Sequence, residues 1–149
     1  MTYLMRCMVG ILLTTITSLV FALSTGDATI LKASNQWAQA IDSRDPHKIA
    51  ALYAKDAILY ATFTDYIDTQ SGILKYFVNL TKNQDLKVTF TKQNIRLFGK
   101  VAIDSGMYIF SYTADGKKVE VPARFTFVYQ ETPKGWMIID HHSSETPEK

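Results

Sequence analysis

Apolar residues recur at helical spacing in the part of the chain that follows residue 24. One such stripe consists of Ile30, Leu31, Trp37, Ala38 and Ile41. This spacing predicts a helix over about 28–43. Asp45 and Pro46 predict the start of a second helix, because aspartate caps free backbone amides and proline fits the first helical turn. We expect Ile49, Leu52 and Tyr53 on the buried side of this helix. A third helix is expected over about 71–83, where Ile73, Phe77 and Leu80 share one face.

The pattern changes to extended segments in the second half of the chain. A short strand is expected at 57–60, and four long ones at 86–98, 101–112, 118–131 and 136–143. Asp115-Gly116 is a strong hairpin signal, because both residue types tolerate positive φ. Helices that precede strands indicate the α+β class. We predict a cone-shaped, curved antiparallel sheet of four long meander strands plus a short one, packed on three N-terminal helices, with an open pocket.

The first 24 residues differ from the rest of the chain. Residues 1–23 hold one basic residue, Arg6, and no acidic one, and an apolar run follows Arg6. Ala22-Leu23-Ser24 then offers small residues at the spacing that signal peptidase needs. We therefore expect a signal peptide at 1–24, cleaved near 22–24, and an exported, periplasmic or secreted domain over 25–149. A retained anchor is the alternative, but threonine and serine dilute the run.

Cysteine usage and charge exclude several classes of function. The only cysteine, Cys7, lies in the expected signal peptide, so the mature chain would have no disulfide and no thiolate metal site. The formal net charge is +2, falls by one without Arg6, and no basic run is visible. We therefore expect no nucleic-acid partner, contact with a membrane only during export, no metal and no cofactor.

Arg124 is the most informative polar residue within a predicted strand. Phe125 and Phe127 would share one face of that strand, while Arg124, Thr126 and Val128 would share the other. Arg124 could hold an anion inside the pocket through its planar fork of donors. Alternatively, it is a solvated charge on the outer face, and the aromatic residues form the core.

Two histidines stand side by side in the last strand. His141 and His142 must point to opposite faces, so they cannot do the same job. A histidine beside a pocket could act as a general base, or backbone and interface partners could satisfy it. Neither forms a convincing metal site, because adjacent strand side chains diverge. Tyr60, Tyr108 and Tyr112 could supply hydroxyl groups.

Several motifs together resemble a known superfamily. The early ones are Trp37 with Ala40, Asp45-Pro46, the run 51–57, and Gly72-Ile73 with Tyr76-Phe77. These resemble nuclear-transport-factor-2-like proteins, including SnoaL-like polyketide cyclases. The late ones are the run 123–129, Gly135-Trp136 and His142-x-Ser144. These resemble the association (hub) domain of calcium/calmodulin-dependent protein kinase II and its free-standing bacterial relatives. Nothing resembles a kinase domain.

The resemblance implies a cone-like fold, an open pocket and self-association through the outer face of the sheet. The kinase hub pocket is lined by arginines; Arg124 matches one, whereas Ser143 and Tyr108 stand where two others are expected. Strand parity would then place Arg124, His141 and Ser143 in the cavity, with Trp136 and His142 facing away. The candidate ligand-binding residues are Arg124, His141, Ser143, Tyr108, Tyr60 and Trp37.

Three functions remain open at this stage. The first is a self-associating module, a homodimer or larger oligomer, that binds a small, partly apolar or weakly anionic molecule. The second is an isomerase, cyclase or dehydratase in which His141 is the acid or base, Tyr60 or Tyr108 donates a hydrogen bond and Arg124 steadies negative charge. The third is a structural hub with no ligand. Whether the protein is an enzyme is left undecided, because one fold hosts many activities.

Overall fold

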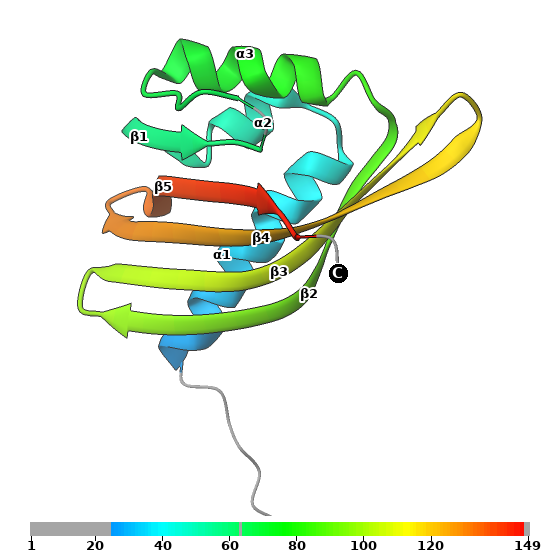
Figure 1. The fold of residues 1–149 in the computed structure, drawn as a ribbon. Coiled ribbons are helices and arrows are strands. Elements are labelled where there is room, and N and C mark those ends of the chain that lie inside the picture. Colours follow the sequence, from blue (N-terminus) through cyan, green and yellow to red (C-terminus); the bar gives the residue numbers. More distant parts are fainter. Residues whose placement is uncertain (1–24, 63, 148–149) are drawn as a thin grey trace, which may run out of the picture.

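The computed structural model describes residues 25–62 and 64–147, which form three helices and one curved sheet (Figure 1). The helices are α1 (Thr25–Asp42), α2 (Pro46–Ala50) and α3 (Gln70–Leu80). The strands are β1 (Tyr53–Tyr60), β2 (Gln84–Phe98), β3 (Val101–Ala114), β4 (Lys117–Thr132) and β5 (Gly135–Glu145). The predicted α+β architecture is confirmed. The expected signal peptide and Cys7 lie outside the described residues.

The sheet has the strand order β1-β5-β4-β3-β2. Strands β2 to β5 form the predicted antiparallel meander. β1 pairs in parallel with β5, so that Leu59 lies opposite His141 and Tyr60 opposite His142. The sheet is therefore mixed. A parallel neighbour requires a long crossover, and here α3 and three strands lie between the two partners (Figure 1).

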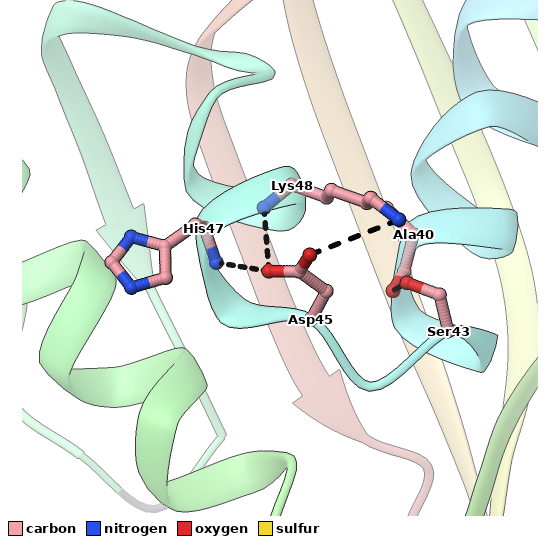
Figure 2. A network of polar contacts seen from close by, with 5 residues as sticks. All are labelled: Ala40, Ser43, Asp45, His47 and Lys48. Carbon is pink, nitrogen blue, oxygen red and sulfur yellow. Dashed lines mark hydrogen bonds and ion pairs between the residues drawn. The ribbon is translucent and has the colours of Figure 1, made fainter.

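The short helix α2 begins where the sequence predicts. An Asp45 carboxylate oxygen accepts hydrogen bonds from the backbone amides of His47 at 3.0 Å and Lys48 at 3.2 Å (Figure 2). The bond from the Lys48 amide is the main cause that lowers the pKa of Asp45. The helix ends at Ala50, so Tyr53, expected on its buried side, belongs to β1 instead. This places the Tyr53 side chain beside β5.

Aromatic rings fill the space between α1 and the sheet. Trp37 of α1 is completely buried, and its ring centroid lies 5.0 Å from that of Phe127, 5.4 Å from that of His141 and 6.1 Å from that of Tyr108. Such edge and offset contacts add to the stabilisation that burial itself provides. The stripe that predicted α1 therefore sets the position of the helix on the sheet.

Gly106 marks the point where β3 bends against β2. The pairing of the two strands shifts between Phe90 and Lys92, which indicates a bulge. A Cβ atom on Gly106 would lie 1.9 Å from the carbonyl oxygen of Lys92. Only glycine permits that approach, so this residue is required for the local curvature.

Among the helices of the described residues, none has both the length and the apolar character that a membrane span requires.

Candidate functional site

A partly open pocket lies between the sheet, α1 and α3. Its volume is about 190 Å³. Its lining is mostly aromatic and aliphatic and consists of Trp37, Leu59, Ala61, Thr62, Tyr76, Leu80, Asn83, Leu86, Tyr108, Phe110, Tyr112, Val121, Ala123, His141 and Ser143. No lysine, arginine, aspartate or glutamate is in this lining. The site is therefore an uncharged pocket with a few polar groups.

One side of His141 is held by a buried chain of hydrogen bonds. Nε1 of Trp37 lies 3.0 Å from the hydroxyl oxygen of Tyr53, and that oxygen lies 2.8 Å from Nδ1 of His141. An indole N–H can only donate, so the Tyr53 oxygen accepts from Trp37 and keeps its own proton available for His141. The Tyr108 hydroxyl donates to Ser143, so its contact with Nε2 of His141 requires a proton on Nε2. Nδ1 is then the acceptor, and the neutral ring carries its proton on Nε2.

The other side of His141 continues toward the cavity. The Tyr108 hydroxyl oxygen lies 3.4 Å from Nε2 of His141, and the hydroxyl donates to Oγ of Ser143 at 2.6 Å. Oγ of Ser143 lies 2.9 Å from Oγ1 of Thr62. The chain of polar groups thus runs from the buried Trp37 to two hydroxyls in the cavity wall.

Burial controls the protonation of these groups. His141 is 3 % exposed, and this burial lowers its pKa to about 3. Burial is also the first cause that raises the pKa values of Tyr53 and Tyr108. All three are therefore neutral near pH 7. With both ring nitrogens occupied, His141 is a weak general base and serves better to orient its neighbours.

The structure brings four of the predicted site residues together. Trp37, Tyr108, His141 and Ser143 all line the cavity. They come from α1, β3 and β5, and the pairing of β3 with β4 and of β4 with β5 aligns the three strand residues. Their roles in binding or catalysis stay predictions.

The position expected for Arg124 is wrong. Arg124 is exposed, lies opposite Ser144 in β5, and shares a shallow surface depression with Thr126 and His142. Its neighbour Phe125 is buried and pairs with Ser143 on the inner face. Successive residues of a strand point to opposite sides, so Arg124 cannot share the cavity with His141. Arg124 is therefore a solvated charge on the outer face, which was the second interpretation of this strand.

Tyr60 also lies outside the cavity. Its side chain is 45 % exposed, and its ring centroid lies 6.2 Å from that of His142 and 6.1 Å from that of Tyr66. The preceding residue, Leu59, is fully buried and lines the cavity. The alternation along β1 therefore turns Tyr60 to the outer face, beside His142.

Trp136 faces the helices, contrary to the parity expectation. The pairing of β4 with β5 shifts between Val128 and Tyr129, where Asp140 and Ile138 are the successive partners. This bulge adds one residue to β5, so Ile138 and His141 are both buried. Trp136 has the parity of Ile138 and packs against the core. The sequence does not reveal the bulge.

Four further residues of the site were not singled out as candidates. Thr62 and Asn83 lie in polar segments that resemble ordinary loops, and Asn83 donates to the carbonyl of Leu80 at 2.9 Å. Tyr76 stands on the predicted third helix, and burial raises its pKa to about 12. Tyr53 was expected on a helix. The high tyrosine count was the available signal, but it does not select among eight tyrosines.

A second buried polar network lies away from the cavity. Oγ of Ser34 donates to Oδ2 of Asp104 at 2.6 Å, and the Tyr129 hydroxyl lies 3.0 Å from Oγ of Ser34. Nε2 of Gln93 donates to the same Asp104 oxygen at 2.8 Å. Asp104 is fully buried, and burial raises its pKa despite these bonds. Asp104 lies within β3.

The described residues contain no group of three or more histidine, cysteine, aspartate and glutamate side chains that could hold a metal ion.

Comparisons with known proteins agree with this geometry. The profile of the calcium/calmodulin dependent protein kinase II association domain family matches residues 26–147. The chain belongs to this family, and its fold is that of nuclear-transport-factor-2-like proteins. A search of curated proteins finds no match.

Solved structures show the same fold. A protein from Xanthomonas campestris, described as a calcium/calmodulin dependent protein kinase II association domain, is 32% identical, with a TM-score of 0.79 over 93% of this chain and 100% of that one. The kinase II hub of S. rosetta is 18% identical, with a TM-score of 0.70 over 80% and 95%. A protein from Streptomyces avermitilis, described as a dehydratase of the NTF2-like family, is 14% identical, with a TM-score of 0.76 over 81% and 96%.

Proposed function

We propose that this protein is an exported, self-associating domain that binds a small, neutral and largely apolar molecule in the cavity beside His141. The observation that carries the proposal is the pocket of about 190 Å³, with an uncharged lining and a hydroxyl cluster at one place in its wall. A somewhat smaller apolar cavity in another protein, about 150 Å³, binds benzene. A ligand of about ten non-hydrogen atoms therefore suits this space.

The lining favours a neutral ligand over an anionic one. A buried charge needs a partner, and leaving it unpaired costs several kcal/mol. The arginine that could have paired with a carboxylate, Arg124, lies on the outer face. His141 cannot replace it, because its lowered pKa keeps it uncharged near neutral pH.

The hydroxyl cluster favours a ligand with a hydrogen-bond acceptor. Tyr108 donates its proton to Ser143, so the Ser143–Thr62 pair holds two protons of its own and needs only one for its mutual bond. Whichever of the two hydroxyls donates within the pair, one O–H remains for a ligand. A carbonyl or ether oxygen is the group that this O–H would recognise.

The enzyme alternative has weaker support. It needs an acid or base near neutrality, whereas burial lowers the pKa of His141 to about 3 and both its nitrogens have partners. The dehydratase from Streptomyces avermitilis shares 14% identity, which supports the fold alone. Binding without chemistry is therefore the function that we favour.

Self-association is supported by the outer face of the sheet. Ile103 of β3 pairs with Val128 of β4, and Met107 pairs with Arg124, so these apolar side chains share the face of that exposed arginine. The relatives of this chain are described as association or hub domains. Light scattering on the mature protein tests this part. A monomer at all concentrations would contradict it.

Export rests on residues 1–24 and needs its own measurement. The intact mass of the protein recovered from its host's export compartment should correspond to a chain that begins near residues 22–24. A full-length chain in the cytosolic fraction would contradict export and leave the pocket proposal untouched.

The pocket is tested with three ring compounds of similar size. Acetophenone carries an acceptor, ethylbenzene carries none, and benzoate is charged. We expect acetophenone to bind best, and the double variant Thr62→Val/Ser143→Ala to weaken its affinity about two- to tenfold, the range of one hydrogen bond, while ethylbenzene is unaffected. Arg124→Leu is the control and should change neither affinity. Tighter binding of benzoate, or equal losses for both neutral compounds, would overturn the proposal.

A further inference from the structure

A second concave site lies on the other side of the Tyr53 backbone, where α1 meets the β4–β5 turn. It is an open groove of about 710 Å³. Its walls come from α1, the segment 50–55, the first residue of α3 and the turn between β4 and β5. The lining residues are Thr29, Lys32, Ala33, Gln36, Ala50, Ala51, Leu52, Tyr53, Lys55, Gln70, Lys134, Gly135, Trp136 and Met137.

All charged side chains that line the groove are positive. Lys32 comes from α1, Lys55 from β1 and Lys134 from the β4–β5 turn, and no carboxylate is in the lining. Within the described part of the chain, the ion pairs are Lys48 with Asp45 and Lys118 with Glu120, so these three lysines have no acidic partner there. Three ammonium groups around one concave surface attract an anion.

An aromatic side chain gives the groove an apolar surface. Trp136 is half-buried and packs against the core, so its position is fixed by the protein interior. The part of the side chain that stays exposed lines the groove, where a flat molecule can stack on it. The β5 bulge is what turns Trp136 to this side, because without it Trp136 would share the outer face with His142.

One wall of the groove is rigid. The side-chain amide of Gln70 donates to the carbonyl of Tyr53 at 3.1 Å and to that of Ala54 at 2.6 Å. These bonds tie the start of α3 to β1. The segment that carries Lys55 is therefore held in place before any ligand arrives, which reduces the entropy that binding costs.

We propose that this groove binds a small organic anion with a flat apolar body. The anionic group lies among Lys32, Lys55 and Lys134, and the flat body stacks on Trp136. The site is separate from the cavity beside His141, whose lining is uncharged. No residue lines both sites, although both lie near Tyr53. The two sites therefore take ligands of different charge.

The test uses 2-naphthoate as the probe and 2-naphthalenemethanol as its neutral analogue. Both are titrated into the full mature protein, with the indole N–H signal of Trp136 followed by NMR. We expect naphthoate to shift this signal and the alcohol to bind at least about tenfold more weakly. Naphthoate that leaves the Trp136 signal unchanged would overturn the proposal.

Two matched triple variants separate this groove from general charge attraction. Lys32→Gln/Lys55→Gln/Lys134→Gln removes the three groove charges, and Lys82→Gln/Lys87→Gln/Lys117→Gln removes three exposed charges elsewhere. We expect the first to weaken naphthoate binding at least about tenfold and the second less than about twofold. Equal losses in both variants would show non-specific attraction and overturn the proposal. The acetophenone titration is unaffected by either variant, so failure here leaves the cavity proposal standing.

Discussion

The hydroxyl of Tyr53 and the ring of His141, 88 positions apart in sequence, are joined by a hydrogen bond of 2.8 Å to Nδ1. Trp37 donates to the same hydroxyl from the opposite side at 3.0 Å. The indole can only donate, so the Tyr53 proton is available for Nδ1, and the proton that Tyr108 gives to Ser143 leaves Nε2 of His141 as the donor to Tyr108. The cavity therefore has a defined hydrogen-bond polarity.

The first prediction concerns the tautomer of His141. We expect Nε2 to carry the proton and Nδ1 to be unprotonated, since Nδ1 accepts from Tyr53. Nitrogen-15 NMR of the histidine ring distinguishes the two neutral tautomers from the imidazolium. A proton on Nδ1 at neutral pH would contradict the assigned direction of the chain.

Removing the Tyr53 hydroxyl should destabilise the fold. Tyr53→Phe leaves the indole N–H of Trp37 and Nδ1 of His141 without their partner, which costs about 1–3 kcal/mol of unfolding free energy for each buried group left unsatisfied. Tyr112→Phe is the matched control, because Tyr112 also lines the cavity but its hydroxyl makes no hydrogen bond to a described residue. Urea unfolding measures both. Similar losses in the two variants would count against the chain.

The lowered pKa of His141 predicts how stability depends on pH. Its pKa is about 3 in the folded protein and near 6.5 in an unfolded chain, so between these values the unfolded state binds more protons. Stability is fully present above about pH 6.5 and falls as the pH decreases, by up to about 1.4 kcal/mol per pH unit. His141→Gln should have a flatter profile below that pH. Parallel profiles would refute the assignment.

The buried carboxyl group of Asp104 predicts the opposite dependence of stability on pH. Burial raises its pKa, so its contribution to stability is present below the ordinary value of about 4 and is lost as the pH rises through the folded pKa. Asp104→Asn keeps an oxygen for Ser34 and Gln93 but cannot ionise. We expect the stability difference to shift in favour of the variant as the pH rises above about 4. A difference that does not change with pH would be the contrary result.

The bend at Gly106 can be tested with one methyl group. Gly106→Ala pushes a Cβ atom against the Lys92 carbonyl, and we expect a loss of about 1–3 kcal/mol. In Gly26→Ala the new atom meets only the mobile end of Leu97, so the expected change is within about 1 kcal/mol. Thermal unfolding compares the two. Equal effects would show that the backbone contact relaxes without cost.

The sequence predicts the positions of helices and strands better than it predicts which face of each strand is buried. The stripe of Trp37 and the hairpin signal at Asp115 depend on local rules, and both elements occur where expected. Which side of a strand is interior depends on partners far away in the chain. The side chains around Arg124 and around Tyr60 alternate between the two faces of their strands. No local signal shows that Phe125 and Leu59 are the residues that point inward.

Trp136 shows a different limit. Strict alternation from His142 places Trp136 on the outer face of β5. One extra residue near Ile139 turns it to the inner face instead. A bulge leaves no dependable mark in a single sequence. The same is true of the parallel pairing of β1 with β5, since a strand edge is chosen by the whole fold and not by the strand.

The pairing of β1 with β5 has a consequence for the order in which the protein is assembled. Every other strand pair joins neighbours in the chain, whereas β1 must wait for the final strand before it gains a sheet partner. Such long-range contacts form late, because loop closure costs entropy before the contact can repay it. His141 and Ser143 arrive with that last strand, so a growing or truncated chain that stops before residue 135 has the residues of most of the sheet but lacks these two polar groups of the cavity wall.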